Sequence, residues 1–256
     1  MRVLFWNTYK KENNSLICKI VRERQINIAV LTEYNDDIDD LAINSGMNKY
    51  QSIGCNKLTI LGNYKNVEMG TQANRYSFQI VKKKYILCAL HLPSRMSDGH
   101  QERRNLVIDM ILHDLKVHED ALNSKCSIIV GDFNEDPFEA GCLAAPHFFG
   151  LPYKSSNQYR IIEEQKFEKF YNPMWNMFGD FKSPPGTYYY NESNPTGTYW
   201  HLFDQVLIRP DLKNCFVEKS LEIVTKAGKY SLLDNSGHPN KKYSDHLPII
   251  FELQEE

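Results

Sequence analysis

The sequence predicts an α/β fold in which two mixed β-sheets pack against each other and helices cover their outer faces. In the first half of the chain, short apolar runs typical of buried strands alternate with amphipathic helical patterns. Further strand and hairpin patterns follow in the second half. Polar side chains lie beside several of the apolar runs, and polar groups at strand ends usually serve chemistry. The same pattern therefore also predicts a functional site.

The elements can be placed along the chain from the spacing of apolar residues. Strands are predicted at residues 2–7, 26–31, 57–61, 75–81, 85–90, 126–130, 203–208, 216–224 and 247–253. Helices are predicted at 12–24, where Leu16, Ile17, Ile20 and Val21 share one face, at 101–117 and at 161–171. Frequent prolines and tyrosines between 146 and 201 indicate a loop-rich surface around the last of these helices.

Composition indicates an ordinary globular protein. The chain has 256 residues, of which 42% are hydrophobic and 24% charged, so it can bury a sizeable core. No signal peptide is evident, and no apolar run approaches the ~20 residues of a membrane span. The six cysteines lie far apart without metal-binding spacing, which favours reduced thiols. We therefore expect a cytoplasmic protein without a membrane span, and no obligate protein partner is evident.

The charge balance bears on nucleic-acid binding. The formal net charge is -2, whereas proteins that hold duplex DNA without sequence preference usually carry a basic stripe. The only tight basic triplet, residues 82–84, reads more naturally as a solvated hairpin turn. A high-affinity duplex binder is disfavoured, although a local basic patch is compatible with a near-neutral total.

Six motifs place polar residues on or beside predicted strands. Two of them, Gly131-Asp132-Phe133-Asn134 and Ser244-Asp245-His246, follow or precede an apolar run. The other four are Phe5-Trp6-Asn7, Leu31-Thr32-Glu33, His91-Leu92-Pro93-Ser94 and Phe203-Asp204-Gln205-Val206. One such motif is weak evidence, but six in order are hard to produce by chance.

The ordered motifs resemble those of the endonuclease/exonuclease/phosphatase family, the DNase I-like proteins. The resemblance implies a four-layer α/β sandwich with an active site at one end, and a metal-dependent phosphodiester hydrolase, here a nuclease acting on DNA or RNA. Its motifs run from Asn7 to His246, so we expect one catalytic domain over residues 1–256.

The resemblance implies a Mg²⁺ or Mn²⁺ site. Glu33 would be the principal ligand, with Asn7 beside it and Asp245 as a further ligand. Carboxylate and amide oxygens are hard ligands that suit these ions better than zinc. Tyr9 stands where some relatives place a further acidic ligand, which puts a second metal in doubt.

The same resemblance assigns the acid–base residues. His246 is the candidate general base, and Asp204 is the carboxylate that would fix its tautomer and stabilise the imidazolium. Asn134 would donate to a phosphoryl oxygen. Asp132 would hold the water, a second metal or the leaving group, and the sequence leaves these roles open. His91 would act as an electrophilic donor or general acid.

Three further residues are candidates for substrate binding. Ser94 and Arg95 follow His91, and an arginine fork suits phosphate. Trp200, near a tyrosine-rich stretch at 184–190, would offer a ring on which an exposed base stacks. This favours single-stranded or locally distorted nucleic acid.

Two alternatives remain at this level. The same site would also serve a lipid headgroup or a small phosphate ester, but the residues typical of inositol 5-phosphatases are absent after Asn134 and around Asp204. A non-enzymatic binding module is disfavoured because every matched catalytic position is chemically competent.

Overall fold

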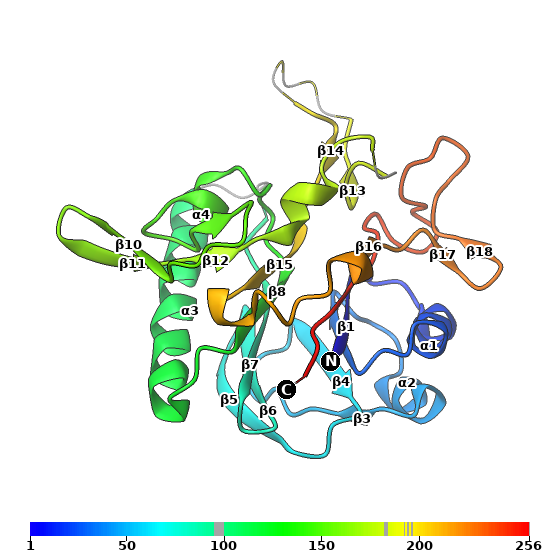
Figure 1. Cartoon of the computed structure of the whole chain (residues 1–256). Helices are drawn as coiled ribbons and strands as arrows, with labels where there is room; N and C mark the ends of the chain where they lie inside the picture. Colours follow the sequence, from blue (N-terminus) through cyan, green and yellow to red (C-terminus); the bar gives the residue numbers. More distant parts are fainter. Residues whose placement is uncertain (95–99, 182–183, 192, 194, 196, 256) are drawn as a thin grey trace.

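The computed structural model describes residues 1–94, 100–181, 184–191, 193, 195 and 197–255 (Figure 1). Two mixed β-sheets lie face to face at its centre. Helices α1 (Asn14–Glu23) and α2 (Ile38–Ser45) cover one outer face, and α3 (His100–Leu122) covers the other. The four-layer α/β sandwich predicted from the sequence is therefore confirmed.

The first sheet has six strands, and the motifs nearest the two ends of the sequence adjoin its strands. In spatial order they are β16 (Glu222–Ile223), β19 (Ile249–Glu252), β1 (Arg2–Asn7), β2 (Ile28–Thr32), β4 (Leu58–Gly62) and β3 (Asn48–Lys49). Strands β1 and β2 run parallel, and their register pairs Asn7 with Thr32. Glu33 follows immediately, so the first two motifs end at the same edge of the sheet.

The second sheet has seven strands. In spatial order they are β5 (Val67–Ala73), β6 (Tyr76–Val81), β7 (Tyr85–His91), β8 (Ser127–Asp132), β15 (Asp204–Ile208), β12 (Phe170–Tyr171) and β9 (Gly150–Leu151). Strands β7 and β8 are parallel and pair His91 with Asp132, while the antiparallel β15 pairs Asp204 with the same Asp132. Three motifs therefore meet at one end of this sheet.

Side-chain alternation along the central strands explains why both faces of the second sheet are buried. In β8, Ile128 and Val130 face the core between the sheets, whereas Ile129 faces α3. The α3 side of this second core contains Ile108, Ile111 and other apolar residues of the helix. A strand covered on both faces must be apolar throughout, which is why β7 and β8 read as unbroken apolar runs.

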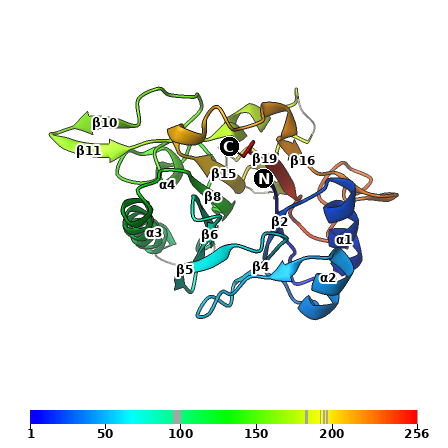
Figure 2. The same cartoon turned by 60° about the horizontal axis from the view of Figure 1, so that its bottom comes forward.

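Shorter elements lie outside the sandwich. They are the hairpins β10–β11 (Tyr159–Ile162 and Gln165–Glu168), β13–β14 (Tyr188–Tyr189 and Trp200–His201) and β17–β18 (Lys226–Ala227 and Tyr230–Ser231), the helix α4 (Ala140–Leu143) and 3-10 turns at Pro173–Met177, Pro210–Leu212 and Glu218–Ser220. Figure 2 shows β10–β11 extending away from the sheets. No helix in the described part of the chain combines the length and the apolar character needed to cross a membrane.

The structure corrects several predicted elements. The predicted helix at 161–171 is wrong, because this segment forms the β10–β11 hairpin and then β12. Its strong helix formers lie in the exposed hairpin, and Phe170 and Tyr171 are drawn into the second sheet beside β15. The predicted strand at 216–224 reduces to a bridge at Phe216 and to β16. Helix α2 and strand β5 were not predicted.

Candidate active site

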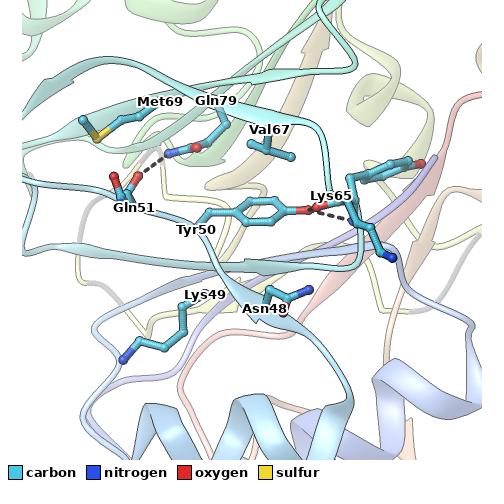
Figure 3. A pocket seen from close by; sticks show the side chains of 9 residues that line it. Asn48, Lys49, Tyr50, Gln51, Lys65, Val67, Met69 and Gln79 are labelled. Carbon is cyan, nitrogen blue, oxygen red and sulfur yellow. Dashed lines mark hydrogen bonds between the residues drawn. The ribbon is translucent and has the colours of Figure 1, made fainter.

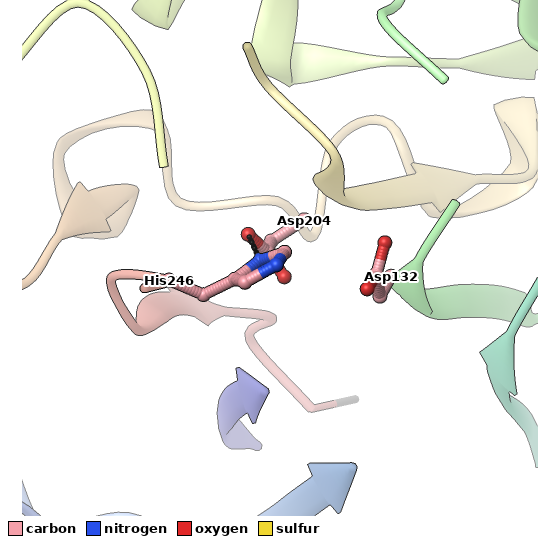
Figure 4. A group of neighbouring side chains, drawn as sticks. All are labelled: Asp132, Asp204 and His246. Carbon is pink, nitrogen blue, oxygen red and sulfur yellow. Dashed lines mark hydrogen bonds and ion pairs between the residues drawn. The ribbon is translucent and has the colours of Figure 1, made fainter. Parts of the chain in front are cut away.

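A carboxylate–imidazole pair lies where the ends of the two sheets meet. The Nδ1 atom of His246 is 2.8 Å from Oδ2 of Asp204, and both residues are buried (Figure 4). The backbone of His246 is fixed from two sides: its carbonyl accepts from Trp6 Nε1 at 3.0 Å, and its N–H donates to Ser244 Oγ at 3.0 Å. The pair is therefore rigid. Because Nδ1 of His246 is bound to Asp204, Nε2 is the ring nitrogen that faces away from this carboxylate.

The carboxylates around His246 favour its charged form. Burial alone lowers the pKa of His246, but the charge and hydrogen bond of Asp204, followed by the charges of Asp132 and Asp245, outweigh burial and raise this pKa to about 10. Without a bound cation the ring is therefore an imidazolium at neutral pH.

Asp132 lies in the middle of the site and is held by two donors. Its Oδ2 accepts from Asn7 Nδ2 at 3.0 Å, and its Oδ1 accepts from the backbone N–H of Asn134 at 2.9 Å. Burial raises the pKa of Asp132 to about 6, with Asp204 adding to the rise and His246 opposing it. Asn134 has a φ of 50°, a conformation that asparagine tolerates, and its Nδ2 donates to Leu92 O at 3.1 Å.

His91 faces both carboxylates without forming a short hydrogen bond to either. Its Nε2 is 3.6 Å from Asp132 Oδ2 and 3.9 Å from Glu33 Oε1. Its Nδ1 is buried and has no hydrogen-bond partner among the described residues. Burial lowers the pKa of His91 to about 4, so the ring is neutral at pH 7 and can donate a hydrogen bond.

Glu33 adopts a left-handed backbone conformation, with a φ of 48°. Its carbonyl accepts from Thr8 Oγ1 at 3.0 Å and from the N–H of Lys10 at 2.9 Å, which holds this conformation in place. A non-glycine residue at this φ is strained, and such strain persists where the surroundings fix it. Thr8 is thus a supporting residue that the sequence patterns did not identify.

The donors near Glu33 fit a hard divalent cation. Asp245 is half-buried, burial raises its pKa, and its Oδ1 has no hydrogen-bond partner in the described part of the chain. The Oδ1 of Asn7 accepts a hydrogen bond from Tyr9 N at 3.1 Å, and an amide oxygen has a second lone pair that can bind a cation. The oxygens of Glu33, Asn7 and Asp245 are ligands that Mg²⁺ and Mn²⁺ prefer.

A second grouping also has ligand geometry. Ligand atoms of Asp132, Asp204 and His246 lie within 4.8 Å of one another. In this grouping, however, Asp204 and His246 already bind each other. The pair is better suited to moving a proton than to holding an ion.

A cavity of about 340 Å³ joins these groups. It is lined by Asn7, Tyr9, Glu33, His91, Ser94, Asp132, Asn134, Tyr188, Tyr190, His201, Phe203, Asp245 and His246. Ser94 is among these lining residues, and its role in substrate binding stays a prediction. Trp200 is not among the lining residues; it packs edge-on against Tyr189, with ring centroids 5.4 Å apart. Arg95 lies outside the described residues.

Sequence reasoning missed a second carboxylate–imidazole pair at the wall of the cavity. His201 Nδ1 is 2.7 Å from Asp136 Oδ2, and Asp136 Oδ1 accepts from the N–H of Leu202 at 2.7 Å. The His201 ring stacks on Phe203 at 4.6 Å, and Tyr188 stacks on the same Phe203 at 5.2 Å. Asp136 and His201 lie in no shared motif, so no local signal linked them.

A larger cavity, of about 540 Å³, lies away from this site between β3 and β5 (Figure 3). Its lining comprises Asn48, Lys49, Tyr50, Gln51, Tyr64, Lys65, Val67, Met69 and Gln79. This set contains no carboxylate, imidazole or thiol. Of these two cavities, only the smaller one is lined by groups suited to acid–base or metal chemistry.

Comparisons with solved structures define the class of fold. An AP endonuclease from Archaeoglobus fulgidus superposes with a TM-score of 0.58 at 11% identity over the full length of both chains. The 3'-5' exonuclease NExo from Neisseria meningitidis gives 0.55 at 14% identity, also over both full chains. The human Nocturnin catalytic domain gives 0.56 at 14% identity, covering 98% of this chain and 92% of the other.

The chain therefore has the DNase I-like fold that the motif resemblance implied. No family model matches the sequence, and no curated protein matches it in sequence.

Proposed function

We propose that the protein is a Mg²⁺- or Mn²⁺-dependent phosphodiester hydrolase, and specifically a nuclease. The observation that carries the proposal is the Asp204–His246 pair, which opens into the same cavity as the carboxylates of Glu33, Asp132 and Asp245. Phosphodiester hydrolysis needs an activated water and positive charge or donors for the phosphoryl oxygens. The cavity offers a candidate for each.

The solved structures of similar fold support a nucleic-acid substrate. Their names describe an AP endonuclease, a 3'-5' exonuclease and the endonuclease domain of the retrotransposon TRAS1. The tyrosine rings that line the cavity favour single-stranded or locally distorted nucleic acid, whose exposed bases can stack. The six cysteines form no disulfide in the described part of the chain, which suits a reducing compartment, and the proposed location is the cytoplasm.

Glu33, Asn7 and Asp245 would hold the metal ion. When bound, the ion supplies positive charge to the phosphoryl oxygens and offsets part of the carboxylate field that raises the pKa of His246. This assignment is supported by the oxygen donors and by the unpartnered Oδ1 of Asp245.

The remaining roles follow from the contacts of each side chain. His246 accepts the proton of the attacking water at Nε2, since Nδ1 is held by Asp204, and Asp204 stabilises the imidazolium that forms. The neutral His91 ring donates a hydrogen bond to the phosphoryl group, together with the amide of Asn134 and the hydroxyl of Ser94. Asp132, whose pKa is about 6, is the group best placed to pass a proton to the leaving oxygen.

Hydrolysis by the wild type and by His246→Ala tests this function. Each protein is assayed with Mg²⁺, Mn²⁺ or EDTA on labelled single- and double-stranded DNA, on RNA and on phosphoinositides. Loss of the general base should lower kcat at least about a hundredfold while the circular dichroism spectrum is retained. His113→Ala, which removes an exposed histidine of α3, is the matched control and should retain full activity.

Two results would contradict the proposal. Retention of more than about a tenth of the activity in His246→Ala would remove its role as general base. Equal activity with EDTA and with Mg²⁺ would remove the metal. Hydrolysis of phosphoinositides alone would leave the catalytic assignment standing and replace the substrate.

A further inference from the structure

Four lysines lie on two loops that contact each other and that contribute Tyr9 and Asp245 to the lining of the catalytic cavity. Lys10 and Lys11 lie between β1 and α1, and Lys241 and Lys242 lie in the turn before the Asp245–His246 motif. The loops are joined by a hydrogen bond from Asn13 Nδ2 to Tyr243 O at 2.7 Å. We call these four residues the lysine rim.

The lysine rim has no carboxylate partner in the described part of the chain. None of its four ammonium groups lies within 4.0 Å of an Asp or Glu oxygen, whereas Lys49, Lys82 and Lys125 each form an ion pair. Three rim residues are exposed, and Lys11 is half-exposed beside the Tyr9 ring. The near-neutral charge of the whole chain therefore includes a local group of lysines that form no ion pair among the described residues.

A side groove of about 410 Å³ connects this charge to the catalytic cavity. It is lined by Tyr189, Asp234, His238, Pro239, Asn240, Lys241, Lys242 and Asp245. Asp245 lines both the groove and the catalytic cavity, so the two are adjacent. Strand β13 forms a shared wall, with Tyr188 on the catalytic side and Tyr189 on the groove side.

Two acidic residues also line the groove, and neither forms an ion pair with the lysine rim in the described part of the chain. Asp234 accepts from the backbone N–H groups of Ser236 and His238 through Oδ1, at 2.8 and 3.0 Å. Asp245 is a candidate metal ligand. The His238 ring stacks on Tyr189 at 3.6 Å, which stiffens the wall opposite the lysines.

We infer that the lysine rim and the side groove bind backbone phosphates that flank the scissile one, so that the substrate is a nucleic-acid strand running past Asp245 into the groove. This rests on the proposed function and specifies its substrate as a polymer. Phosphates beside the reacting group match unpaired ammonium charges, and each such contact adds salt-dependent affinity. A small ester would fill the catalytic cavity alone and leave the rim unused.

An anionic membrane is the other polyanion that such charges attract, and the surface near the rim does not favour it. The exposed large side chains that line the catalytic cavity are tyrosines, Tyr9 and Tyr190. Of the exposed aliphatic side chains, Ile43, Leu106 and Ile161 lie on α2, α3 and β10, and Ile53 lies between β3 and β4. Membrane-binding surfaces combine basic residues with inserted apolar ones.

Binding without turnover tests the inference directly. In the His246→Ala background, Lys10→Ala/Lys11→Ala and Lys241→Ala/Lys242→Ala are titrated against a short labelled single strand at several salt concentrations. Each pair should weaken binding about tenfold at low salt and reduce the logarithmic salt slope by roughly 1.4, which is twice the ~0.7 expected per phosphate contact. Lys83→Ala/Lys116→Ala removes the same charge from two exposed sites remote from the rim and should bind normally.

Turnover separates this inference from the proposed function. With His246 intact, the rim variants should raise KM for the oligonucleotide far more than KM for bis(para-nitrophenyl) phosphate. Affinities equal to those of the Lys83/Lys116 control would overturn the inference, as would rim-dependent retention on anionic vesicles without oligonucleotide binding. If the wild type hydrolyses neither substrate, the proposed function fails, and the binding titration still decides whether the lysine rim holds nucleic acid.

Discussion

At the scale of single residues, the site depends on backbone positions that are unfavourable in themselves. Glu33 has a φ of 48°, a conformation that costs a side-chain-bearing residue roughly 1–2 kcal/mol. Two hydrogen bonds to its carbonyl, from Thr8 and Lys10, hold it there. Glu33 follows β2, and an extended backbone there would direct its side chain elsewhere. The left-handed conformation instead turns the side chain toward His91. We interpret this conformation as part of how the proposed metal site is formed.

The pKa of His246 provides a residue-scale prediction. Asp204→Asn removes the charge that does most to raise this pKa, so the pKa should fall clearly below its value of about 10. An NMR titration of the imidazole measures it in metal-free protein. A histidine whose pKa is raised on folding stabilises the folded state. This stabilisation is complete below the pKa of the unfolded chain, 6.5, and is lost as pH rises through the folded value of about 10. Asp204→Asn should therefore lower the free energy of unfolding at pH 6 and change it little above pH 10.

Asp136→Asn is the control for this titration. It perturbs the other carboxylate–imidazole pair and should leave the pKa of His246 unchanged. An unchanged His246 titration in Asp204→Asn would show that Asp132 and Asp245, rather than Asp204, set its charge.

The sequence could identify the groups at strand ends but not their supports. Glu33, Asp132 and His246 stand out because each adjoins an apolar run in a recognisable motif. Asp136 and His201 pair across 65 residues, and neither occupies a position that a motif marks. Such pairs exist only once the hairpin β13–β14 has folded over the end of β8.

At the scale of elements, helix α3 supports the loop that follows β8. Arg104 is 1% exposed, and its Nη1 donates to Asn134 O at 2.8 Å while its Nε lies 3.3 Å from Glu135 Oε1. Glu135 is equally buried. The guanidinium therefore connects the helix to the segment that presents Asp132 and Asn134.

Arg104→Met should destabilise the protein strongly. Removal of one partner leaves the Glu135 carboxylate buried beside fewer donors, a change that costs about 3–5 kcal/mol. Urea unfolding followed by circular dichroism measures the loss. The double variant Arg104→Met/Glu135→Gln should recover part of it, because the unpaired charge is gone; equal stability of the single variant and the wild type would contradict this account.

Element boundaries show where sequence periodicity fails. Helix α2 is only eight residues long and buries just Leu41, so its apolar pattern was too short to detect; its start depends on the Asp37 carboxylate accepting from the N–H groups of Asp39 and Asp40. In the β10–β11 hairpin, Glu163 and Glu164 adopt positive φ in the turn. In this hairpin, antiparallel pairing between β10 and β11 outweighs the helix propensity of the residues.

At the scale of the whole molecule, the site exists because two sheets end together. Asn7 and Glu33 come from the first sheet, and His91, Asp132 and Asp204 from the second. The apolar core between the sheets, which includes Val30, Val130 and Val206, fixes their separation. Proteins that are only 11–14% identical share this fold, as expected when the volume and pattern of a core, rather than its particular residues, specify the layers.

A polar contact also connects the two sheets at the end opposite the site. Glu255, which follows β19 of the first sheet, accepts from Tyr64 and pairs with Lys82 in the β6–β7 turn of the second sheet. Met1 N lies 3.1 Å from the same carboxylate. Burial raises the pKa of Glu255, but these three donors outweigh it and lower the pKa to about 2.

Glu255→Gln should therefore destabilise the fold in a pH-dependent way. A carboxylate with a depressed pKa adds stability above its unfolded pKa of about 4.5 and loses it as pH falls through its folded value of about 2. The gap in unfolding free energy between wild type and variant should be full at pH 7 and close between these two values. Urea titrations at pH 7 and pH 3 measure it, with the exposed Glu164→Gln as the matched control. A gap that stays constant with pH would mean that shape and hydrogen bonding at Glu255, and not its charge, hold the sheets together at this end.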